Sequence, residues 1–248
     1  MRLSMCMCVL CLLPLFAQDQ AESDVSLSLG VGVLVNQEPY RDVDSDTWVI
    51  PLVSMRYHRF FMRGVDLGLD LVKGDRATLS LTVRPEFLDL DEGDGSYFAG
   101  LHERELTAMA GLNLDVDLGN RFSLEVRGET DIFDRNEGIS AGVSVGRLFI
   151  HGRTVFRPEL GITYTDQDYN NYYYGVLPDE VRVDRPFYEP DSELRYRAAF
   201  FLQHNFSERF SGLIQIGGEY LGDEITNSPL IDSDTSLFGV VGFSYKVR

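Results

Sequence analysis

The sequence predicts an all-β protein, a single antiparallel transmembrane β-barrel. Segments of about ten residues alternate between apolar and polar side chains, which is the period of a strand with one wet face. Short turns alternate with long polar connections along the chain. An apolar run at residues 5–16 is typical of an export signal. Together these features indicate an outer-membrane barrel with short periplasmic turns and longer extracellular loops.

The clearest alternation lies in residues 105–118, ELTAMAGLNLDVDL. One face carries Leu106, Ala108, Ala110, Leu112, Leu114, Val116 and Leu118, and the other carries Thr107, Met109, Gly111, Asn113, Asp115 and Asp117. Residues 79–87, 122–132 and 237–247 follow the same pattern. We expect the apolar faces to contact lipid and the opposite faces to line the lumen.

The polar faces carry arginine beside carboxylates, with little lysine. The residues concerned are Arg56, Arg84, Arg127, Arg157, Arg195 and Arg197 with Asp66, Asp70, Glu86, Asp115, Asp117, Glu125, Glu129, Glu159 and Glu219. Arginine bonds carboxylates bidentately, so these charges suit an enclosed face. We predict a lumen charge network of Arg84, Glu86, Asp115, Glu125, Arg127, Glu129, Arg157, Glu159, Arg195 and Arg197. A secreted soluble β-sandwich is the competing interpretation.

The number of strands follows from the turns. Short turns are expected at residues 58–60, 119–122, 151–153 and 207–210, and long loops at 35–46, 88–104, 166–193 and 223–234. If all short turns share one rim, the segment between residues 60 and 87 holds an odd number of strands. We place three there, at 60–64, 65–72 and 77–87, which gives twelve strands. Ten strands is the alternative, because the segment 60–64 is short.

Residues 1–17 are expected to be a cleaved signal, with Arg2 before the apolar run and Ala17 at the cleavage site. The barrel would then comprise residues 18–248. All three cysteines fall within the signal, so no disulfide and no cysteine metal site is expected. The formal net charge of −17 disfavours nucleic acid as a partner. The expected location is the outer membrane, with membrane lipid and lipopolysaccharide as partners.

No residue pattern predicts catalysis, a cofactor or a metal site. The four histidines, at positions 58, 102, 151 and 204, show no spacing typical of a hydrolase. The acidic stretches at 42–46 and 89–95 do not fit the twelve-residue calcium loop, so solvated loop charge is the favoured interpretation. We therefore do not expect an enzyme.

The stretch DYNNYYYGVLPDE, residues 168–180, stands out in the longest predicted loop. Its characteristic residues are Asp168, Tyr169, Tyr172, Tyr173, Tyr174 and Gly175. The tyrosines are expected to anchor the loop at the membrane interface, with Gly175 supplying a turn. The alternative is that they stack on a sugar or another small ligand at the barrel mouth.

Three motifs resemble the MipA/OmpV family, the MltA-interacting proteins. They are DYNNYYYGV, YLGDEITNSPLI and YRDVDSDTWVIPLVSMRYHRFFMRG, and the resemblance covers essentially the whole mature chain. It implies an outer-membrane scaffold that links a lytic murein transglycosylase to a bifunctional peptidoglycan synthase in cell-wall assembly. Two alternatives remain open: a small-solute or antibiotic-permeable barrel, and an adhesin acting through its outer loops.

Overall fold

A computed structural model describes residues 25–43, 45–86, 88, 90–92 and 94–248. The expected signal at residues 1–17 and the strand residue Phe87 lie outside this part of the chain. The described residues form thirteen strands: β1 (Val25–Gln37), β2 (Asp46–Tyr57), β3 (Phe60–Arg63), β4 (Asp66–Lys73), β5 (Ala77–Glu86), β6 (Thr107–Gly119), β7 (Phe122–Asp131), β8 (Ile139–Arg147), β9 (Phe149–His151), β10 (Thr154–Thr165), β11 (Glu193–Asn205), β12 (Phe210–Tyr220) and β13 (Thr235–Lys246).

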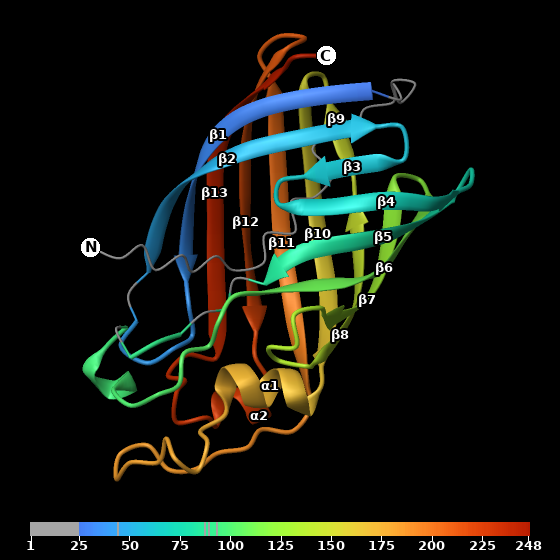
Figure 1. Cartoon of the computed structure of the whole chain (residues 1–248). Coiled ribbons are helices and arrows are strands. Elements are labelled where there is room, and N and C mark those ends of the chain that lie inside the picture. The colour runs from blue at the N-terminus through green and yellow to red at the C-terminus, as the bar shows by residue number, and fades with distance from the viewer. Residues whose placement is uncertain (1–24, 44, 87, 89, 93) are drawn as a thin grey trace.

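The strands form one closed antiparallel barrel (Figure 1). Pairing of β1 with β13 and of β10 with β11 completes the ring. Strands β8 and β9 both pair with β10, on either side of Leu148, and are two parts of one wall strand. The described chain therefore has twelve wall strands, which confirms the prediction.

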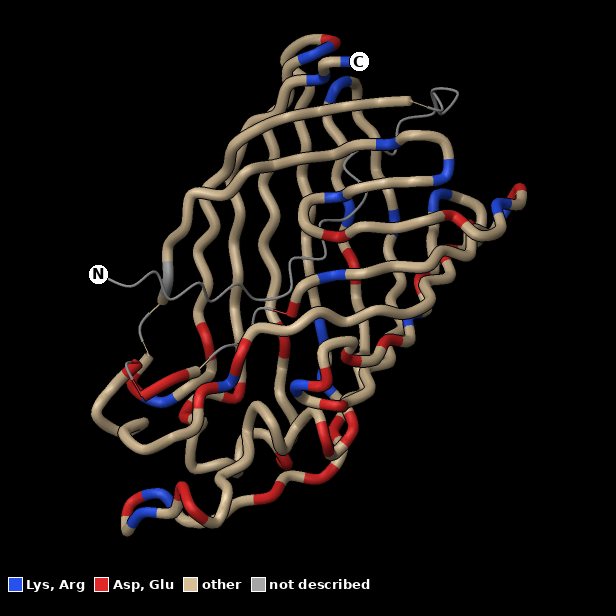
Figure 2. The backbone as a smooth tube through the Cα atoms, viewed as in Figure 1, with Lys and Arg blue, Asp and Glu red and all other residues tan. Residues whose placement is uncertain are grey.

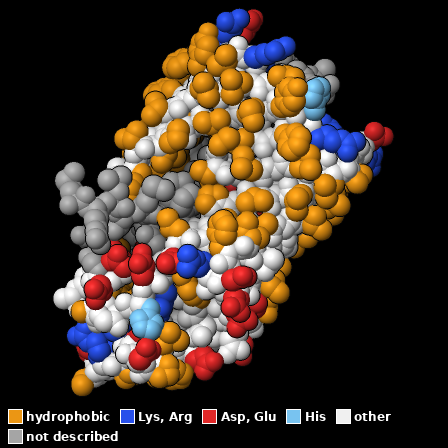
Figure 3. Space-filling model, viewed as in Figure 1, with side chains coloured by type: hydrophobic (Ala, Val, Ile, Leu, Met, Phe, Trp, Pro, Cys, Tyr) orange, Lys and Arg blue, Asp and Glu red, His pale blue; other side chains and the backbone are white. Residues whose placement is uncertain are grey.

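The alternation in sequence becomes the inside and the outside of the wall. Leu112 of β6 points outward and is 49% exposed, whereas its neighbour Asn113 points inward and is 4% exposed. Val33 and Val241, on β1 and β13, are likewise exposed on the outer face. Figure 3 shows apolar side chains covering the wall, as a surface facing lipid requires.

The segment between residues 60 and 86 contains three strands, as predicted, and not the smaller number of the ten-strand alternative. Strand β3 has only four residues, yet it pairs with β2 on one side and β4 on the other. The turn after β3 lies part-way along the wall, because the Gly64 N–H donates to the Val53 carbonyl of β2.

Apart from the turn at residues 64–65, the connections of two to four residues lie at one end of the barrel, which we call the turn rim. They are residues 58–59, 74–76, 120–121, 152–153 and 206–209, in agreement with the predicted turns. His58, Asn120, Arg121 and Gly152 have positive φ, as tight hairpin turns require. The opposite end, the loop rim, carries the long connections and the helices α1 (Gln167–Tyr174), α2 (Asp223–Thr226) and the 3-10 helix η1 (Ser96–Phe98).

None of the helices in the described residues is both long and apolar enough to cross a bilayer.

The lumen has two chemically different sides. The charged residues predicted to face inward lie on β2, on β4 to β7 and on β10 to β12 (Figure 2). A second, apolar group also faces inward and packs together: Leu34, Ile50, Leu52, Ala199, Phe201, Leu213, Phe238 and Val240. Strands β1, β2 and β11 to β13 thus carry apolar residues on both faces, which the sequence analysis did not predict.

Candidate functional site

The tyrosine-rich segment forms helix α1. Asp166 caps its N-terminus by accepting a hydrogen bond from the Tyr169 N–H at 3.1 Å, and Asp168 lies in the first turn, where the helix dipole favours an acid. The Gly175 N–H donates to the Asn171 carbonyl and ends the helix. Gly175 has ordinary extended backbone, but a Cβ there would lie 2.3 Å from Asn171 Oδ1, so close packing is what requires glycine.

Three of the tyrosines are buried. Tyr169, Tyr173 and Tyr174 are at most 2% exposed, whereas Tyr172 is half-buried. The sequence analysis expected these side chains at the lipid interface. They point instead into the loop rim, because the helix turns its aromatic face toward the other loops.

The loops close over the barrel as one hydrophobic cluster, which we call the loop plug. Its members are Tyr40, Leu88, Leu90, Phe98, Leu101, Met109, Tyr169, Tyr173, Tyr174, Val176, Leu221, Ile225, Leu230 and Ile231. Hydrogen bonds join its parts: the Tyr40 hydroxyl donates to the Tyr173 carbonyl, and the Ser228 hydroxyl donates to the Tyr174 carbonyl at 2.6 Å. The Asn136 amide donates to the Tyr173 hydroxyl at 3.2 Å.

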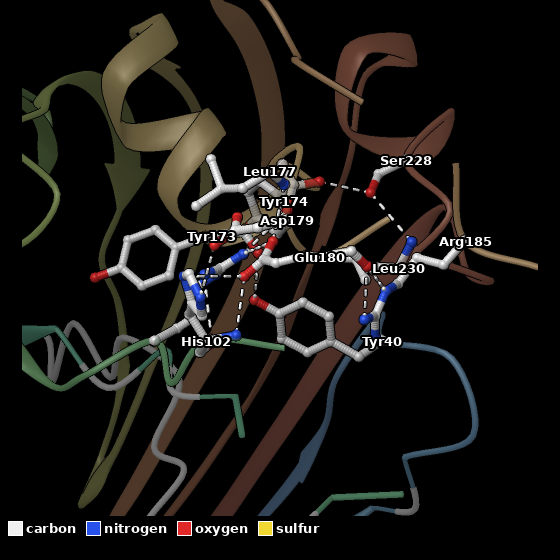
Figure 4. Close-up of polar contacts among 12 residues, drawn as sticks. Tyr40, His102, Tyr173, Tyr174, Leu177, Asp179, Glu180, Arg185, Ser228 and Leu230 are labelled. Carbon is white, nitrogen blue, oxygen red and sulfur yellow. Dashed lines mark hydrogen bonds and ion pairs between the residues drawn. The ribbon is translucent and has the colours of Figure 1, made fainter. Parts of the chain in front are cut away.

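A buried ion pair between Arg104 and Glu180 fixes two of these loops to each other, and Figure 4 shows Glu180 among its contacts. Glu180 accepts hydrogen bonds from Arg104 Nη2 at 2.9 Å, the His102 N–H at 2.9 Å and the Leu177 N–H at 2.8 Å. Burial raises the pKa of Glu180, but these hydrogen bonds outweigh burial and lower it below its ordinary value. Glu180 is therefore held as a carboxylate.

Arg185 reinforces the same contact. Its side chain is fully buried and donates to the carbonyl oxygens of Glu180, Tyr97 and Ala99. Burial, with the nearby Glu86 carboxylate, raises the pKa of Tyr169 and of Tyr173, which keeps both phenols neutral. The sequence analysis missed Arg104 and Arg185, because nothing local to either residue indicates its partner.

The lumen charge network divides into groups. In the largest, Arg84 contacts Glu129 at 2.8 Å and Glu86 at 3.1 Å, and Arg127 contacts Glu125 at 2.7 Å and Glu129 at 3.7 Å. Arg84 belongs to β5 and Glu129 to β7, so this ion pair reaches over β6. These charges hold neighbouring strands together inside the barrel.

The other members form smaller groups. Arg157 pairs with Glu159 at 3.1 Å on the same strand. Arg195 and Arg197 both contact Glu219, at 3.2 and 3.4 Å. Asp115 accepts a hydrogen bond from the Asn113 amide. An inner cavity of about 90 Å³ lies among the paired groups and is lined by four arginines and four glutamates: Arg84, Arg127, Arg195, Arg197, Glu125, Glu129, Glu159 and Glu219.

Within the part of the chain that the structure describes, no three His, Cys, Asp or Glu side chains are grouped to hold a metal ion. His102 lies 3.2 Å from Asp179, and both side chains are exposed. The acidic stretches at 42–46 and 89–95 each include residues outside the described set.

A sequence profile of the family described as MltA-interacting protein MipA matches residues 29–247. The chain belongs to this family. It is 30% identical to the putative outer membrane protein YiaT of Escherichia coli (strain K12) over 224 residues, 89% of this chain and 90% of the relative. It is 26% identical to the MltA-interacting protein of Escherichia coli (strain K12) over 229 residues, 91% and 92% of the two chains. Outer membrane protein Omp26La of Vibrio anguillarum is 28% identical over 199 residues, 77% of this chain and 75% of that protein.

Among solved structures, the chain is similar to the NanC porin, with a TM-score of 0.42 and 10% sequence identity over 90% of this chain and 100% of the porin. YiaT and Omp26La are named as outer-membrane proteins, and this family member is located in the outer membrane. Short turns of such barrels face the periplasm and long loops face outward, so the turn rim is periplasmic and the loop rim external. None of the relatives described here is named as an enzyme.

Proposed function

We propose that this protein is an outer-membrane scaffold that holds a cell-wall enzyme at its turn rim. The partner proposed is a lytic murein transglycosylase, with a bifunctional peptidoglycan synthase as a second partner. Family membership supports the proposal, because one relative is named MltA-interacting protein. In this proposal residues 1–17 direct export and are removed, and residues 18–248 form the barrel, which N-terminal sequencing of the purified protein tests.

The observation that carries the proposal is a ring of positive charge at the turn rim (Figure 2). Nine exposed cations lie there among the described residues: Arg59, Lys73, Arg76, Arg121, Arg147, Arg153, Arg209, Lys246 and Arg248. Only Asp75, Asp117 and Glu208 are exposed carboxylates of the described side chains at the same rim. The whole chain has a formal charge of −17, so this rim differs in sign from the rest of the molecule. Such a ring attracts an acidic protein surface and orients it.

The closed loop plug also favours a scaffold. Buried loops cover the outer end of the barrel, and the lumen arginines below them are held by carboxylates. The turns themselves are short and offer little surface. We therefore propose that the enzyme contacts several turns at once across the rim and does not bind one extended loop.

Site-specific crosslinking tests the proposal. A photo-crosslinking residue at Asn120, in the turn after β6, should capture the transglycosylase in intact cells. The same residue at Asp184, in the external loop after α1, should not. Crosslinking of the transglycosylase from position 184 but not from position 120 would place the partner on the external side of the membrane and would contradict the proposed scaffold role.

A charge reversal tests the role of the ring. Arg153→Glu at the turn rim should weaken capture of the transglycosylase from detergent-solubilised envelope, and added salt should reduce the difference from the unmodified protein. Arg135→Glu, which makes the same change of charge at the loop rim, should leave capture unchanged. Equal effects of both variants would show that overall charge, and not the turn rim, controls binding.

A second candidate, a barrel that binds or passes small solutes, is favoured by the inner cavity. Conduction would require the loop plug to move, because its aromatic side chains cover the barrel at the loop rim. Large, stable single-channel steps from the unmodified protein in planar bilayers would favour this candidate over the scaffold.

A further inference from the structure

A second and larger cavity opens at the turn rim, and we call it the vestibule. It has a volume of about 520 Å³ and is lined by residues of β2 to β7, β9 and β10 and of the turns between them. The charged residues that line it are Arg56, Arg63, Lys73, Arg76, Arg121, Arg157, Asp70, Asp75, Asp115 and Asp117. The vestibule thus has six cations against four carboxylates, whereas the inner cavity has four of each.

Three of the four vestibule carboxylates are already engaged. Asp70 accepts from Arg56 at 2.7 Å and from the Ser80 hydroxyl at 3.0 Å. Asp115 accepts from the Asn113 amide, and Asp117 accepts from the Gly119 N–H at 2.8 Å. Among the described lining residues the cations still outnumber the carboxylates by two.

Arg63 is the cation that the fold presents to the vestibule. It is half-buried on the lumen side of β3, and no carboxylate of the described residues lies within ion-pair distance of it. Its guanidinium lies over the Phe61 ring, 4.4 Å from the ring centre. Arg56 approaches the same ring at 5.6 Å. Two arginines therefore share one aromatic surface, and Arg56 is also held by the carboxylate of Asp70.

Gly68 makes this arrangement fit. A Cβ at position 68 would lie 2.1 Å from Phe61 Cζ, so only glycine lets the ring pack this closely against β4. Phe61 is buried, with 6% of its surface exposed. A fixed ring holds the guanidinium in place, which reduces the conformational entropy that a ligand would otherwise have to remove.

We infer that the vestibule binds a small organic anion, with Arg63 as the central contact. The planar guanidinium of Arg63 would bond a carboxylate or phosphate group through two N–H donors. Arg56 and Arg157 line the same cavity, and Lys73, Arg76 and Arg121 would attract the anion near the turns at the vestibule mouth. The enclosed space suits a ligand of the size of a tricarboxylate or a sugar phosphate. This site does not depend on the proposed scaffold role.

Titration calorimetry on the folded protein in neutral detergent tests the inference. Citrate supplies carboxylates, inorganic phosphate supplies a phosphate, and glucose is the uncharged probe. At low salt we expect citrate or phosphate to bind and glucose not to bind, and the affinity to fall as salt is added. Which of the two anions binds more tightly distinguishes a carboxylate ligand from a phosphate ligand.

Variants locate the site. Arg63→Met keeps the packing on Phe61 and removes the charge, so the dissociation constant should rise about tenfold, as expected for the loss of a charged hydrogen-bonded contact. Arg63→Lys keeps the charge but lacks the planar guanidinium that donates two hydrogen bonds, so its dissociation constant should lie between those of the unmodified protein and Arg63→Met. Arg209→Met removes one charge at the same rim outside the vestibule lining and should change the affinity less than about twofold.

Three results would overturn the inference: no anion binding by the unmodified protein at low salt, equal binding of glucose, or equal weakening by Arg63→Met and Arg209→Met. The heat-dependent migration of barrels on gels checks that each variant is folded. If Arg63→Met fails to fold, Arg63→Lys provides the test. An unchanged affinity for the anion in Arg63→Lys would show that the guanidinium is not required, and would contradict the inference. Loss of anion binding with unchanged capture of the transglycosylase would separate this site from the scaffold.

Discussion

Replacing Glu180 by glutamine should open the loop plug without unfolding the barrel. Glu180 is fully buried and accepts three hydrogen bonds, two on Oε2 and one on Oε1. A glutamine amide can replace one oxygen only, so its NH₂ group must face at least one donor. Arg104, which is 3% exposed, would also lose its counter-charge.

The size of the effect follows from this geometry. Removing one partner of a buried ion pair costs about 3–5 kcal/mol, because the other charge stays buried. At about 1.4 kcal/mol per factor of ten, the equilibrium for local opening should shift by about two to three and a half orders of magnitude. The loss stays local, since the wall strands are held by their own ladders.

Trypsin cleavage after Arg104 provides the assay, because the buried side chain of Arg104 must come out before cleavage. When opening and closing are fast, the cleavage rate follows the opening equilibrium. Asp179→Asn is the matched control: Asp179 is adjacent and exposed, and its contact with His102 is a surface pair worth at most about 1 kcal/mol. Equal cleavage rates in Glu180→Gln and the unmodified protein would refute the reasoning.

Three further outcomes are expected. The pKa of Glu180 is lowered in the folded protein, so the ionised carboxylate stabilises the loop plug fully above the ordinary glutamate pKa, and this stabilisation is lost as pH falls through the lowered pKa. Hydrogen exchange of the loop amides should therefore speed up in that pH range. The Glu180→Gln variant should not show this pH dependence. Leu112→Arg on the outer wall should cost about 2–4 kcal/mol near the bilayer midplane, measured by unfolding in lipid, whereas Thr78→Arg, facing the vestibule, should cost less. A tag at Asp184 should be labelled on whole cells and one at Asn120 should not, and the reverse would overturn the orientation.

The wall of the barrel could be predicted because its signal is local. Alternation over a few residues decides which side chain faces lipid. The requirement that all short turns share one rim predicted a strand at β3, although a segment of four residues would not by itself be predicted as a wall strand. Ion pairs two residues apart on one strand, such as Arg84 with Glu86 and Arg157 with Glu159, follow from the same period.

The apolar side of the lumen could not be predicted in the same way. In β1 and β13, Leu34 and Val240 are buried while their neighbours Val33 and Val241 face lipid. A strand that is apolar on both faces shows little alternation, so its inward residues look the same as its outward ones.

The loop plug was missed for another reason. The Tyr40 hydroxyl reaches the Tyr173 carbonyl across 133 positions of sequence, and Arg104 meets Glu180 across 76. No local pattern indicates which loops meet, because only closure of the barrel brings their ends to one rim. The tyrosines were therefore recognised as unusual but assigned to the membrane interface.

The two ends of the barrel can act independently. The loop plug is held by apolar packing and by the Glu180 contacts, whereas the vestibule lies at the opposite rim and shares no residue with that cluster. Between them, Arg84 and Arg127 contact Glu129, and none of these three residues belongs to the loop plug. Opening the plug alone would thus leave these ion pairs, which reach over β6 on the lumen side of the wall, in place beside the inner cavity. Conduction would require the loop plug to move, whereas binding at the turn rim does not.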